Sequence, residues 1–318
     1  MRMKTAGRRN FGYGKQMDWA GKQALRNRYG NGRYGTVAGH TERWRQFVAW
    51  CRRERGIRDA RRFDRSMVNA YGSCLADKVT ANTMSVSYAQ NLLSSVNVVL
   101  ESMRGDRRIR VAPAALVGKR SHVRGQAPAG LDGQAVRQCA NQLRANGQKR
   151  IASVVELARE LGLRLREASM LDARSALHQA MKHGAVNITA GTKGGRGHRV
   201  DRWVPVSNMT MGCLVRAAKA QGRGRNLIPT KLSWRQWNTR VHHIWAAVRD
   251  DYSLKKLHDL RAAYACERYR GITGSVAPVV AGRRLADRNS DKAARNTIAQ
   301  ELGHARSDVV AAYIGGVR

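Results

Sequence analysis

Apolar residues recur every three or four positions through most of this chain, which is the spacing of amphipathic α-helices. Such segments fill residues 41–103 and recur in residues 133–160, 236–250 and 257–269. Residues 184–205 differ, because valine, isoleucine and tryptophan flank a glycine-rich turn there, as in a β-hairpin. The pattern predicts a mainly α (α+β) fold with one small antiparallel β-sheet.

The charge of the chain is extreme. Its 318 residues include 59 Lys and Arg but 22 Asp and Glu, and the formal net charge of +37 would oppose folding unless a polyanion neutralised it. Nucleic acid is therefore the first expected partner. An anionic membrane is the rival polyanion, but the basic residues are spread along the whole chain, and no apolar stretch reaches the roughly 20 residues of a transmembrane helix. We expect a soluble protein with no membrane partner.

Cysteine, histidine and glycine patterns argue against several kinds of site. The five cysteines lie singly, and the closest histidines, His242 and His243, are adjacent rather than one helical turn apart, so we expect no metal site. Neither a P-loop nor a GxGxxG motif is present, so we expect no nucleotide cofactor. The basic residues 1–14 lack the apolar segment of a signal peptide, so we expect a cytoplasmic protein that joins the nucleoid when bound to DNA.

Composition divides the chain into four parts. Residues 1–35 are rich in glycine and basic residues, which predicts a mobile arm that contacts DNA, with one helix near residues 17–29. Residues 36–103 form a small helical domain, and residues 104–130, with seven Lys or Arg, two prolines and four glycines, predict a basic linker. Residues 131–318 form the second domain. Two domains joined in this way would enclose a DNA duplex.

The C-terminal region contains side chains suited to cutting DNA. His258 and Arg261 form a His-x-x-Arg motif, so they share one helical face and can meet the same phosphate. His304, in a Leu-Gly-His motif, and Tyr313, nine positions later, could reach one site from neighbouring helices. Moving a DNA strand without a metal requires a nucleophile, cations for the phosphate oxygens and an acid for the leaving 5'-oxygen. The simpler interpretation of Tyr313, among apolar neighbours, is a packing residue.

Two basic residues upstream complete the set. Arg164 follows a glycine that ends one predicted helix and itself starts the next, with Glu167 three residues later, and an arginine at a helix start can face a phosphate. Lys193 lies at a predicted hairpin turn ahead of a strand at residues 202–206, where it could reach a scissile phosphate and act as the acid. Taken singly, each residue is equally a surface cation or a contact to the DNA backbone.

In their order and spacing, these residues resemble the signature of the tyrosine recombinase (phage integrase) family. The resemblance rests on six positions: Arg164, Lys193, His258, Arg261, His304 and Tyr313. It extends to the plan of the chain, since the family typically has a helical core-binding (SAM-like) domain before its catalytic domain. On this resemblance, residues 36–103 would bind DNA and residues 131–318 would form the catalytic domain.

The resemblance implies a mechanism centred on a tyrosine. Tyr313 would attack a phosphodiester and form a 3'-phosphotyrosyl link to the DNA. Arg164, Arg261 and His304 would stabilise the phosphorane-like transition state. The energy of the broken bond would be kept in the phosphotyrosine, so the resemblance implies no cofactor.

The remaining residues would have supporting parts in the same mechanism. Lys193 would protonate the leaving 5'-oxygen, and His258 would assist proton transfer to or from the tyrosine or the phosphate. Glu167 matches the acidic position of the family, where it would orient the active-site residues without taking part in the chemistry.

The chain also departs from the family pattern. Ala262 follows Arg261 where the family commonly has a second histidine, and the stretch from Arg261 to His304 is longer than usual. Residues 282–295 are the predicted insertion, either an extra DNA contact or, by preference, a solvated loop. Only five residues follow Tyr313, so we expect the assembly of protomers to use another surface, or the chain to have been shortened.

The favoured function is a site-specific DNA recombinase, the integrase of a mobile element, that acts as a homotetramer on two duplexes. Accessory DNA-bending proteins are further candidate partners. A type IB topoisomerase or a hairpin telomere resolvase would use much the same residues without strand exchange between sites. A non-catalytic DNA-binding protein would suit the charge equally well, but it would leave the complete set of site residues unexplained.

Overall fold

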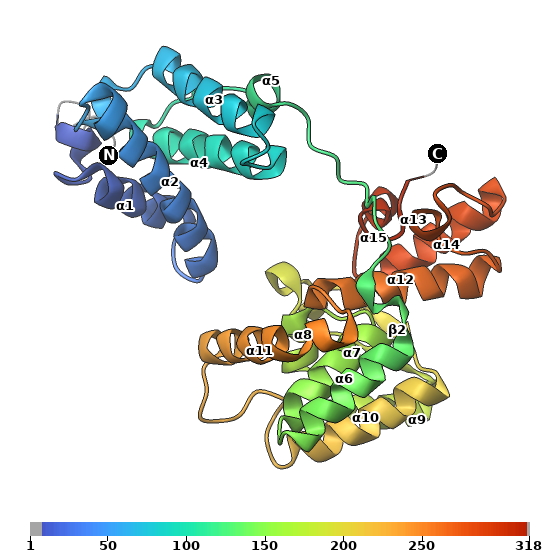
Figure 1. Ribbon diagram of the computed structural model, residues 1–318. Helices are drawn as coiled ribbons and strands as arrows, with labels where there is room; N and C mark the ends of the chain where they lie inside the picture. Colours follow the sequence, from blue (N-terminus) through green and yellow to red (C-terminus); the bar gives the residue numbers. More distant parts are fainter. Residues whose placement is uncertain (1–7, 317–318) are drawn as a thin grey trace. The chain divides into compact units, whose positions relative to one another are not determined.

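The computed structural model describes residues 8–316, which form two compact units divided between residues 121 and 122 (Figure 1). Both units are helical, and the second contains the one sheet found among the described residues, two antiparallel strands. The predicted fold class, mainly α with a small antiparallel sheet, is confirmed. Within the same residues, no helix is both long and apolar enough to cross a membrane.

The first unit packs its helices around an aromatic core. The helices are α1 (Met17–Tyr29), α2 (Tyr34–Arg55), α3 (Arg65–Thr80), α4 (Val86–Arg104) and α5 (Pro113–Val117). Asp64 and Ser85 fix the starts of α3 and α4, because their side chains accept hydrogen bonds from backbone N–H groups of the first turn. The rings in contact at the centre belong to Trp44, Phe47, Trp50, Phe63 and Tyr71.

The mobile arm predicted over residues 1–35 is wrong for the part that the structure describes. Helix α1 has the predicted bounds, but Met17 and Leu25 are fully buried in the core of the first unit. The indole of Trp44 on α2 donates a hydrogen bond to the carbonyl of Met17 (2.8 Å). Gly21 is the reason for this close approach, since a Cβ there would clash with the same indole. Residues 1–7 of the predicted arm lie outside the described residues.

The predicted linker, residues 104–130, is folded only at its two ends, whereas residues 118–128 contain no helix or strand and connect the two units. Val111 and Val117 are buried in the core of the first unit, where α5 packs on α3 and α4. At the other end, a 3-10 turn at Ala129–Leu131 packs on the second unit, and Gly130 lies against Leu260. The sequence predicted a linker from its prolines and glycines, but several of them lie at helix ends: Pro113 begins α5, and Gly105 and Gly118 follow the last residues of α4 and α5.

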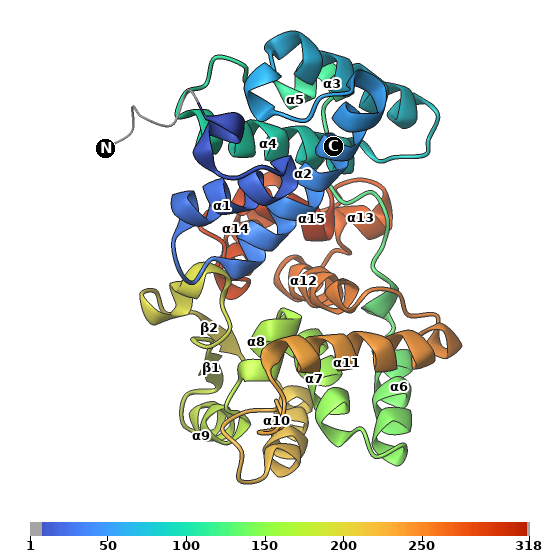
Figure 2. The same ribbon diagram turned by 90° about the vertical axis from the view of Figure 1, so that its left-hand side faces the viewer.

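The second unit holds the remaining helices and the sheet. They are α6 (Gly133–Ala145), α7 (Lys149–Glu160), α8 (Leu165–Met170), α9 (Ala173–His183), β1 (Ala185–Asn187), β2 (Trp203–Pro205), α10 (Asn208–Gln221), α11 (Trp234–Val248), α12 (Leu257–Thr273), α13 (Pro278–Ala281), α14 (Arg288–Glu301) and α15 (Ala311–Ile314). Strands β1 and β2 lie side by side (Figure 2). Val186 of β1 pairs with Val204 of β2, and both side chains are buried. The sheet packs beside α9.

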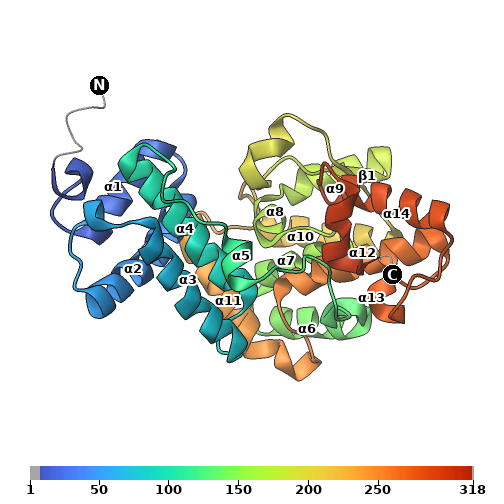
Figure 3. The same ribbon diagram turned by 90° about the horizontal axis from the view of Figure 1, so that it is seen from above.

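Helix α12 organises the functional half of this unit. It packs against α7, α14 and α15, and Figure 3 shows α12, α14 and α15 side by side. Its buried face carries Leu260, Arg261 and Tyr264, so a cation lies in the middle of an otherwise apolar contact. Such a charge requires partners from the surrounding elements, and these partners form the site described below.

The expectation of a solvated loop at residues 282–295 fits residues 282–287, which contain no helix and are mostly exposed, but it is wrong for residues 288–295. The first half of α14 lies in this segment, and its Asp291 and Arg295 are buried and form an ion pair at 3.0 Å. Tyr269 of α12 donates a hydrogen bond to Asp291 (2.8 Å). Arg295 also donates to the carbonyls of Gly315 (3.1 Å) and Gly316 (3.2 Å). The segment therefore connects α12 to the chain that follows Tyr313.

Candidate active site

Arg164 and Glu167 come together at the start of α8. Gly162 ends the preceding helix with a positive φ of 59°, and Tyr264 lies where its Cβ would be. The backbone N–H of Arg164 donates to Glu167 Oε2 (2.8 Å), and its Nη1 donates to Glu167 Oε1 (2.6 Å). This capping arrangement fixes both side chains at one edge of the site.

Glu167 is the shared partner of three arginines. Its fully buried carboxylate lies 2.6 Å from Arg164, 3.0 Å from Arg202 and 3.4 Å from Arg261. Burial alone would raise the pKa of Glu167, but the charges of Arg202, Arg261 and Arg164 lower it to about 2. The carboxylate is therefore ionised at any physiological pH, and it orients the cations around it.

Arg261 is completely buried and joins four segments. Its Nη1 donates to the carbonyl of Gly162 and its Nη2 to the carbonyl of Leu302, both at 2.5 Å. Its Nε donates to the hydroxyl of Tyr313 (3.3 Å). Burial lowers the pKa of Arg261 to about 10, which still leaves it protonated at neutral pH. A fixed positive charge therefore lies at the tyrosine oxygen.

His304 and Tyr313 are in direct contact. His304 Nε2 is 3.1 Å from the hydroxyl of Tyr313 and 3.4 Å from Arg261 Nη2. Because an arginine N–H can only donate, this nitrogen acts as an acceptor, and the tyrosine hydroxyl donates to it. Burial lowers the pKa of His304 to about 4, aided by the charges of Arg261, Arg164 and Arg202. A neutral imidazole is thus aligned to take the proton of Tyr313.

His258 also contacts the tyrosine ring. The two ring centroids are 5.6 Å apart, as are those of His304 and Tyr313. No hydrogen bond joins His258 to the tyrosine hydroxyl within the described residues. The surrounding protein lowers the pKa of His258, and the charges of Arg261 and Arg164 lower it further, although the residue as a whole stays exposed.

Lys193 lies at the rim of a cleft beside this cluster. The cleft has a volume of about 430 Å³, and its lining includes Arg164, Arg202 and His304. Lys193 is exposed and begins a 3-10 turn at Lys193–His198, within the connection between β1 and β2. The sequence predicted a hairpin turn here, but the connection is long and contains a 3-10 turn, which Gly194 and Gly195 interrupt because both adopt positive φ.

Arg202, which no sequence motif singled out, belongs to the same cluster. It directly precedes β2, and only 5% of its surface is exposed. Alternate residues of a strand share one face, and Val204 of this strand is fully buried. That alternation was the available signal, because it places an arginine on the buried face of a strand close to Lys193 in sequence.

The structure thus brings five predicted residues, Arg164, Glu167, Arg261, His304 and Tyr313, into one connected cluster. His258 packs on it through ring contact, and Lys193 reaches the cleft beside it. The packing interpretation of Tyr313 is also partly right, since the residue is 5% exposed. Its hydroxyl, however, is held by two polar side chains, which simple packing does not require.

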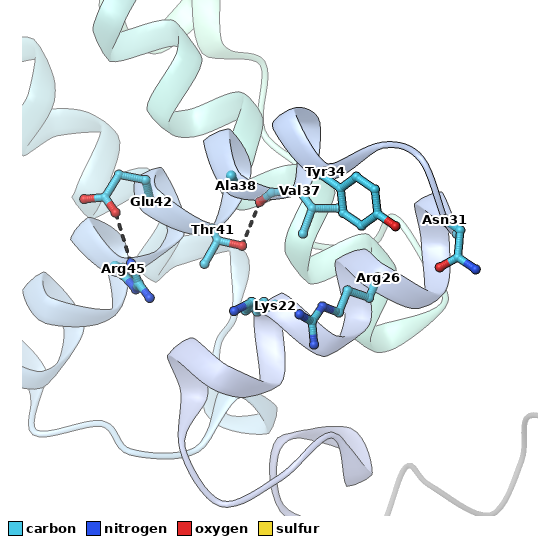
Figure 4. A pocket seen from close by; sticks show the side chains of 10 residues that line it. Lys22, Arg26, Asn31, Tyr34, Val37, Ala38, Thr41, Glu42 and Arg45 are labelled. Carbon is cyan, nitrogen blue, oxygen red and sulfur yellow. Dashed lines mark hydrogen bonds and ion pairs between the residues drawn. The ribbon is translucent and has the colours of Figure 1, made fainter. Parts of the chain in front are cut away.

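A second cavity lies in the first unit, between α1 and α2. Its volume is about 570 Å³, and Figure 4 shows Lys22 and Arg26 on α1 facing Tyr34 and Thr41 on α2. Arg45 also lines this cavity, but it is paired with Glu42 (3.1 Å). The lining is basic and offers no contact between a nucleophile and a base, so we place the candidate active site in the second unit.

Residues 120–267 match the model of the integrase family, a range that includes Arg164, Lys193, His258 and Arg261 and ends before His304 and Tyr313. No curated protein matches the chain.

Two solved structures are similar over most of the chain. One is the Tn1549 transposon integrase in complex with a circular intermediate DNA, with a TM-score of 0.61 and 8% identity over 96% of both chains. The other is the XerH site-specific recombinase in a post-cleavage complex with its palindromic difH substrate, with a TM-score of 0.53 and 14% identity over 87% of this chain and 75% of that one. At these identities the likeness shows a shared fold.

Proposed function

We propose that this chain is a site-specific recombinase of the tyrosine recombinase (integrase) family, which cleaves and rejoins DNA through a covalent tyrosine intermediate, and the match of residues 120–267 to the integrase model supports this proposal. The observation that carries the proposal is the tyrosine hydroxyl held between Arg261 Nε (3.3 Å) and His304 Nε2 (3.1 Å). A nucleophile that contacts both a base and a cation is the arrangement that covalent catalysis requires.

In the cleavage step, the Tyr313 oxygen attacks the phosphorus and its proton passes to His304 Nε2. The bond from phosphorus to the 5'-oxygen breaks, and the DNA 3' end stays attached to the tyrosine. Lys193, at the rim of the cleft, supplies the proton for the leaving 5'-oxygen. Rejoining reverses these transfers, so the step consumes no cofactor.

Arg164 and Arg261 stabilise the negative charge that grows on the phosphate oxygens. Both are fixed before the substrate arrives, Arg164 by Glu167 and Arg261 by backbone carbonyls, so little reorganisation is needed in the transition state. His258 packs against the tyrosine ring, while the contact to the hydroxyl belongs to His304. We therefore assign His258 to a phosphate oxygen rather than to the tyrosine proton.

Double-stranded DNA is the proposed partner, and the net charge of +37 supports it. The first unit would be the core-binding domain, and its basic cavity, lined by Lys22 and Arg26, would contact the DNA backbone. Both similar solved structures are complexes with DNA, and one of them is a transposon integrase. We accordingly propose a role in integrating or excising a mobile element, as a homotetramer on two duplexes.

Trapping on nicked DNA tests the chemistry whatever the target sequence is. The probe is a pool of nicked duplexes of randomised sequence, in which cleavage near the nick releases a short fragment and prevents rejoining. We expect a covalent protein–DNA adduct in denaturing gels, with the attached strand linked through its 3' end. Adducts linked through the 5' end, or no adduct although the pool is bound, would contradict the proposal.

A further inference from the structure

Arg202 is a buried cation that the reaction described above does not use. Its backbone is fixed at the end of β1, because its N–H donates to the side chain of Asn187 (2.9 Å) and its carbonyl accepts from Ile188 (2.9 Å). Its side chain extends to two other segments: Nε donates to the carbonyl of Glu301 (2.6 Å), and Nη1 lies 3.0 Å from Glu167. One residue therefore joins β2, α8 and the end of α14.

The two terminal nitrogens of Arg202 are incompletely partnered. Both are buried, and neither makes a hydrogen bond within the described residues. Nη1 nevertheless lies 3.0 Å from the carboxylate of Glu167 and forms an ion pair with it. Arg202 lines the same cleft as Arg164, Lys193 and His304. Buried polar groups are normally hydrogen-bonded, so a buried guanidinium with unused N–H donors beside the reaction site calls for an explanation.

Charge balance supplies the first reason. Arg164, Arg202 and Arg261 surround a single carboxylate, Glu167, so the cluster holds two more positive than negative charges. Buried like charges repel one another, and the arrangement is stable only with further anionic partners. A phosphodiester brings one negative charge, and the transition state of its cleavage brings a second. The two negative charges of the reacting phosphate in the transition state therefore balance the two excess positive charges of the cluster.

The position of His304 supplies the second reason. Gly303 has a φ of 68°, and a Cβ on it would lie 3.1 Å from Cδ of Arg202, so the arginine lies directly beneath the turn. The bond from Arg202 to the carbonyl of Glu301 holds the start of the same turn. Its end is held by the N–H of His304, which donates to Ala299 (2.7 Å). Arg202 and α14 together fix where the imidazole meets Tyr313.

We propose that Arg202 is a positioning residue of this site, which holds Glu167 and the turn at residues 301–304 in place so that His304 stays aligned with Tyr313. The inference rests on the proposed function, since it assigns Arg202 a part in the same reaction. It adds an eighth charged or nucleophilic group to Glu167 and the six residues that the sequence motif supplies. Arg202 acts through Glu167 and His304 and does not itself contact the reacting atoms.

The test compares Arg202→Met and Arg202→Lys with wild type on the nicked DNA pool. We expect the affinity for DNA to be kept and the rate of adduct formation to fall about 100-fold in Arg202→Met, the order of loss that a misplacement of about 1 Å causes. Arg202→Lys keeps the charge but not the forked contacts, so it should recover part of the rate. Arg199→Met, an exposed arginine in the same connection, is the matched control and should cleave like wild type.

A double-mutant comparison with Glu167 distinguishes a positioning role of Arg202 from a general loss of structure. If Arg202 acts through Glu167, the change Glu167→Gln costs much less in the Arg202→Met background than in wild type. Equal costs in both backgrounds would overturn the inference. If Arg202→Met does not fold, Arg202→Lys decides alone, and a wild-type cleavage rate there would overturn the inference as well.

The pH dependence of the cleavage rate also tests the inference, because a purely structural role of Arg202 would leave it unchanged. His304 is faced by Arg261 from α12, by Arg164 and Glu167 from α8, by Arg202 from β2 and by the tyrosine of α15. It must be neutral to accept the proton, so cleavage is lost as the pH falls through its pKa. Removing the charge of Arg202 raises that pKa, and Arg202→Met should lose activity at a higher pH than wild type.

The positioning role would be contradicted if Arg202→Met lost activity at the same low pH as wild type and was only slower by the same factor at every pH. The failure of the inference also differs from the failure of the proposed function. If wild type forms no adduct, the proposed function fails. If wild type forms the adduct and Arg202→Met forms it equally fast, only the inference fails.

Discussion

At the scale of single residues, the site is a balance of buried charges around one hydroxyl. Arg261, Glu167 and His304 are each costly to bury alone, and the contacts among them offset that cost. The direction of each pKa shift follows from this packing: the carboxylate is kept ionised and the imidazole is kept neutral. These are the protonation states that attack by a tyrosine requires.

Glu167→Gln should destabilise the protein, because it leaves the buried Arg202 and Arg261 and the partly buried Arg164 without their carboxylate. We expect the free energy of unfolding at pH 7 to fall by about 3 kcal/mol, as when one partner of a buried ion pair is removed. The pKa of Glu167 is depressed in the folded state, from 4.5 to about 2, so its contribution is complete above pH 4.5 and disappears as the pH falls towards 2.

Urea unfolding across that pH range measures the effect. The matched control is Glu54→Gln, since Glu54 forms a surface ion pair with Arg53 and should contribute at most about 1 kcal/mol. A variant at position 167 as stable as wild type at pH 7 would mean that the carboxylate does not organise the cluster.

At the scale of elements, the sequence predicted well where helices form, but poorly which residues their side chains contact in the fold. The apolar spacing predicted α11 and α12 closely, because a helix's buried face is a local property of the chain. The predictions of a mobile arm and of a loop over residues 288–295 were wrong for one reason: both depend on contacts between parts of the chain that are distant in sequence. Gly21 does not break its helix but allows Trp44 to pack against it. The buried ion pair of α14, Asp291 with Arg295, also contacts Tyr269 and Gly315.

The same limit explains the site. Six positions could be proposed because the resemblance fixes their order along the chain, but no local pattern reports that Arg202 reaches Glu301 across nearly a hundred residues. Nor could spacing show which histidine contacts the hydroxyl of Tyr313. That choice depends on how α12 and α15 pack, and the packing gives the contact to His304.

Gly21→Ala tests whether α1 belongs to the first unit. The added Cβ meets the indole of Trp44, so we expect a loss of about 1–3 kcal/mol in the free energy of unfolding, typical of overpacking. Gly39→Ala on α2, where an added Cβ would meet only the end of the Arg43 side chain at 3.7 Å, is the control and should be neutral or stabilising by up to about 1 kcal/mol. If both variants are equally stable in thermal unfolding, α1 does not pack as described.

Arg295→Met tests the role of α14 in holding the chain after Tyr313. The change leaves Asp291 buried with only Tyr269 as a partner and frees two carbonyls, so we expect a loss of about 3 kcal/mol and slower adduct formation. Arg288→Met, exposed on the same helix, should leave both unchanged. Full stability of Arg295→Met by urea unfolding would argue that the segment is an ordinary surface insertion after all.

At the scale of the whole molecule, the excess of positive charge and the fold point to the same partner. A chain with a net charge of +37 and the fold of a recombinase is suited to bind DNA mainly through phosphates. We expect the affinity for duplex DNA to fall steeply with salt, along a straight line of log affinity against log salt concentration. Fluorescence anisotropy on a labelled duplex measures it, and an affinity independent of salt would contradict phosphate binding.

Covalent trapping of the Tyr313→Phe variant tests the central claim most directly. This change removes one oxygen, so the variant should bind the nicked DNA pool like wild type and form no covalent adduct, while Tyr252→Phe, a partly buried tyrosine elsewhere in the second unit, should form it normally. In wild type, peptide mapping of the adduct should find the nucleotide on Tyr313. An adduct that persists in Tyr313→Phe, or one that maps to another residue, would contradict the account.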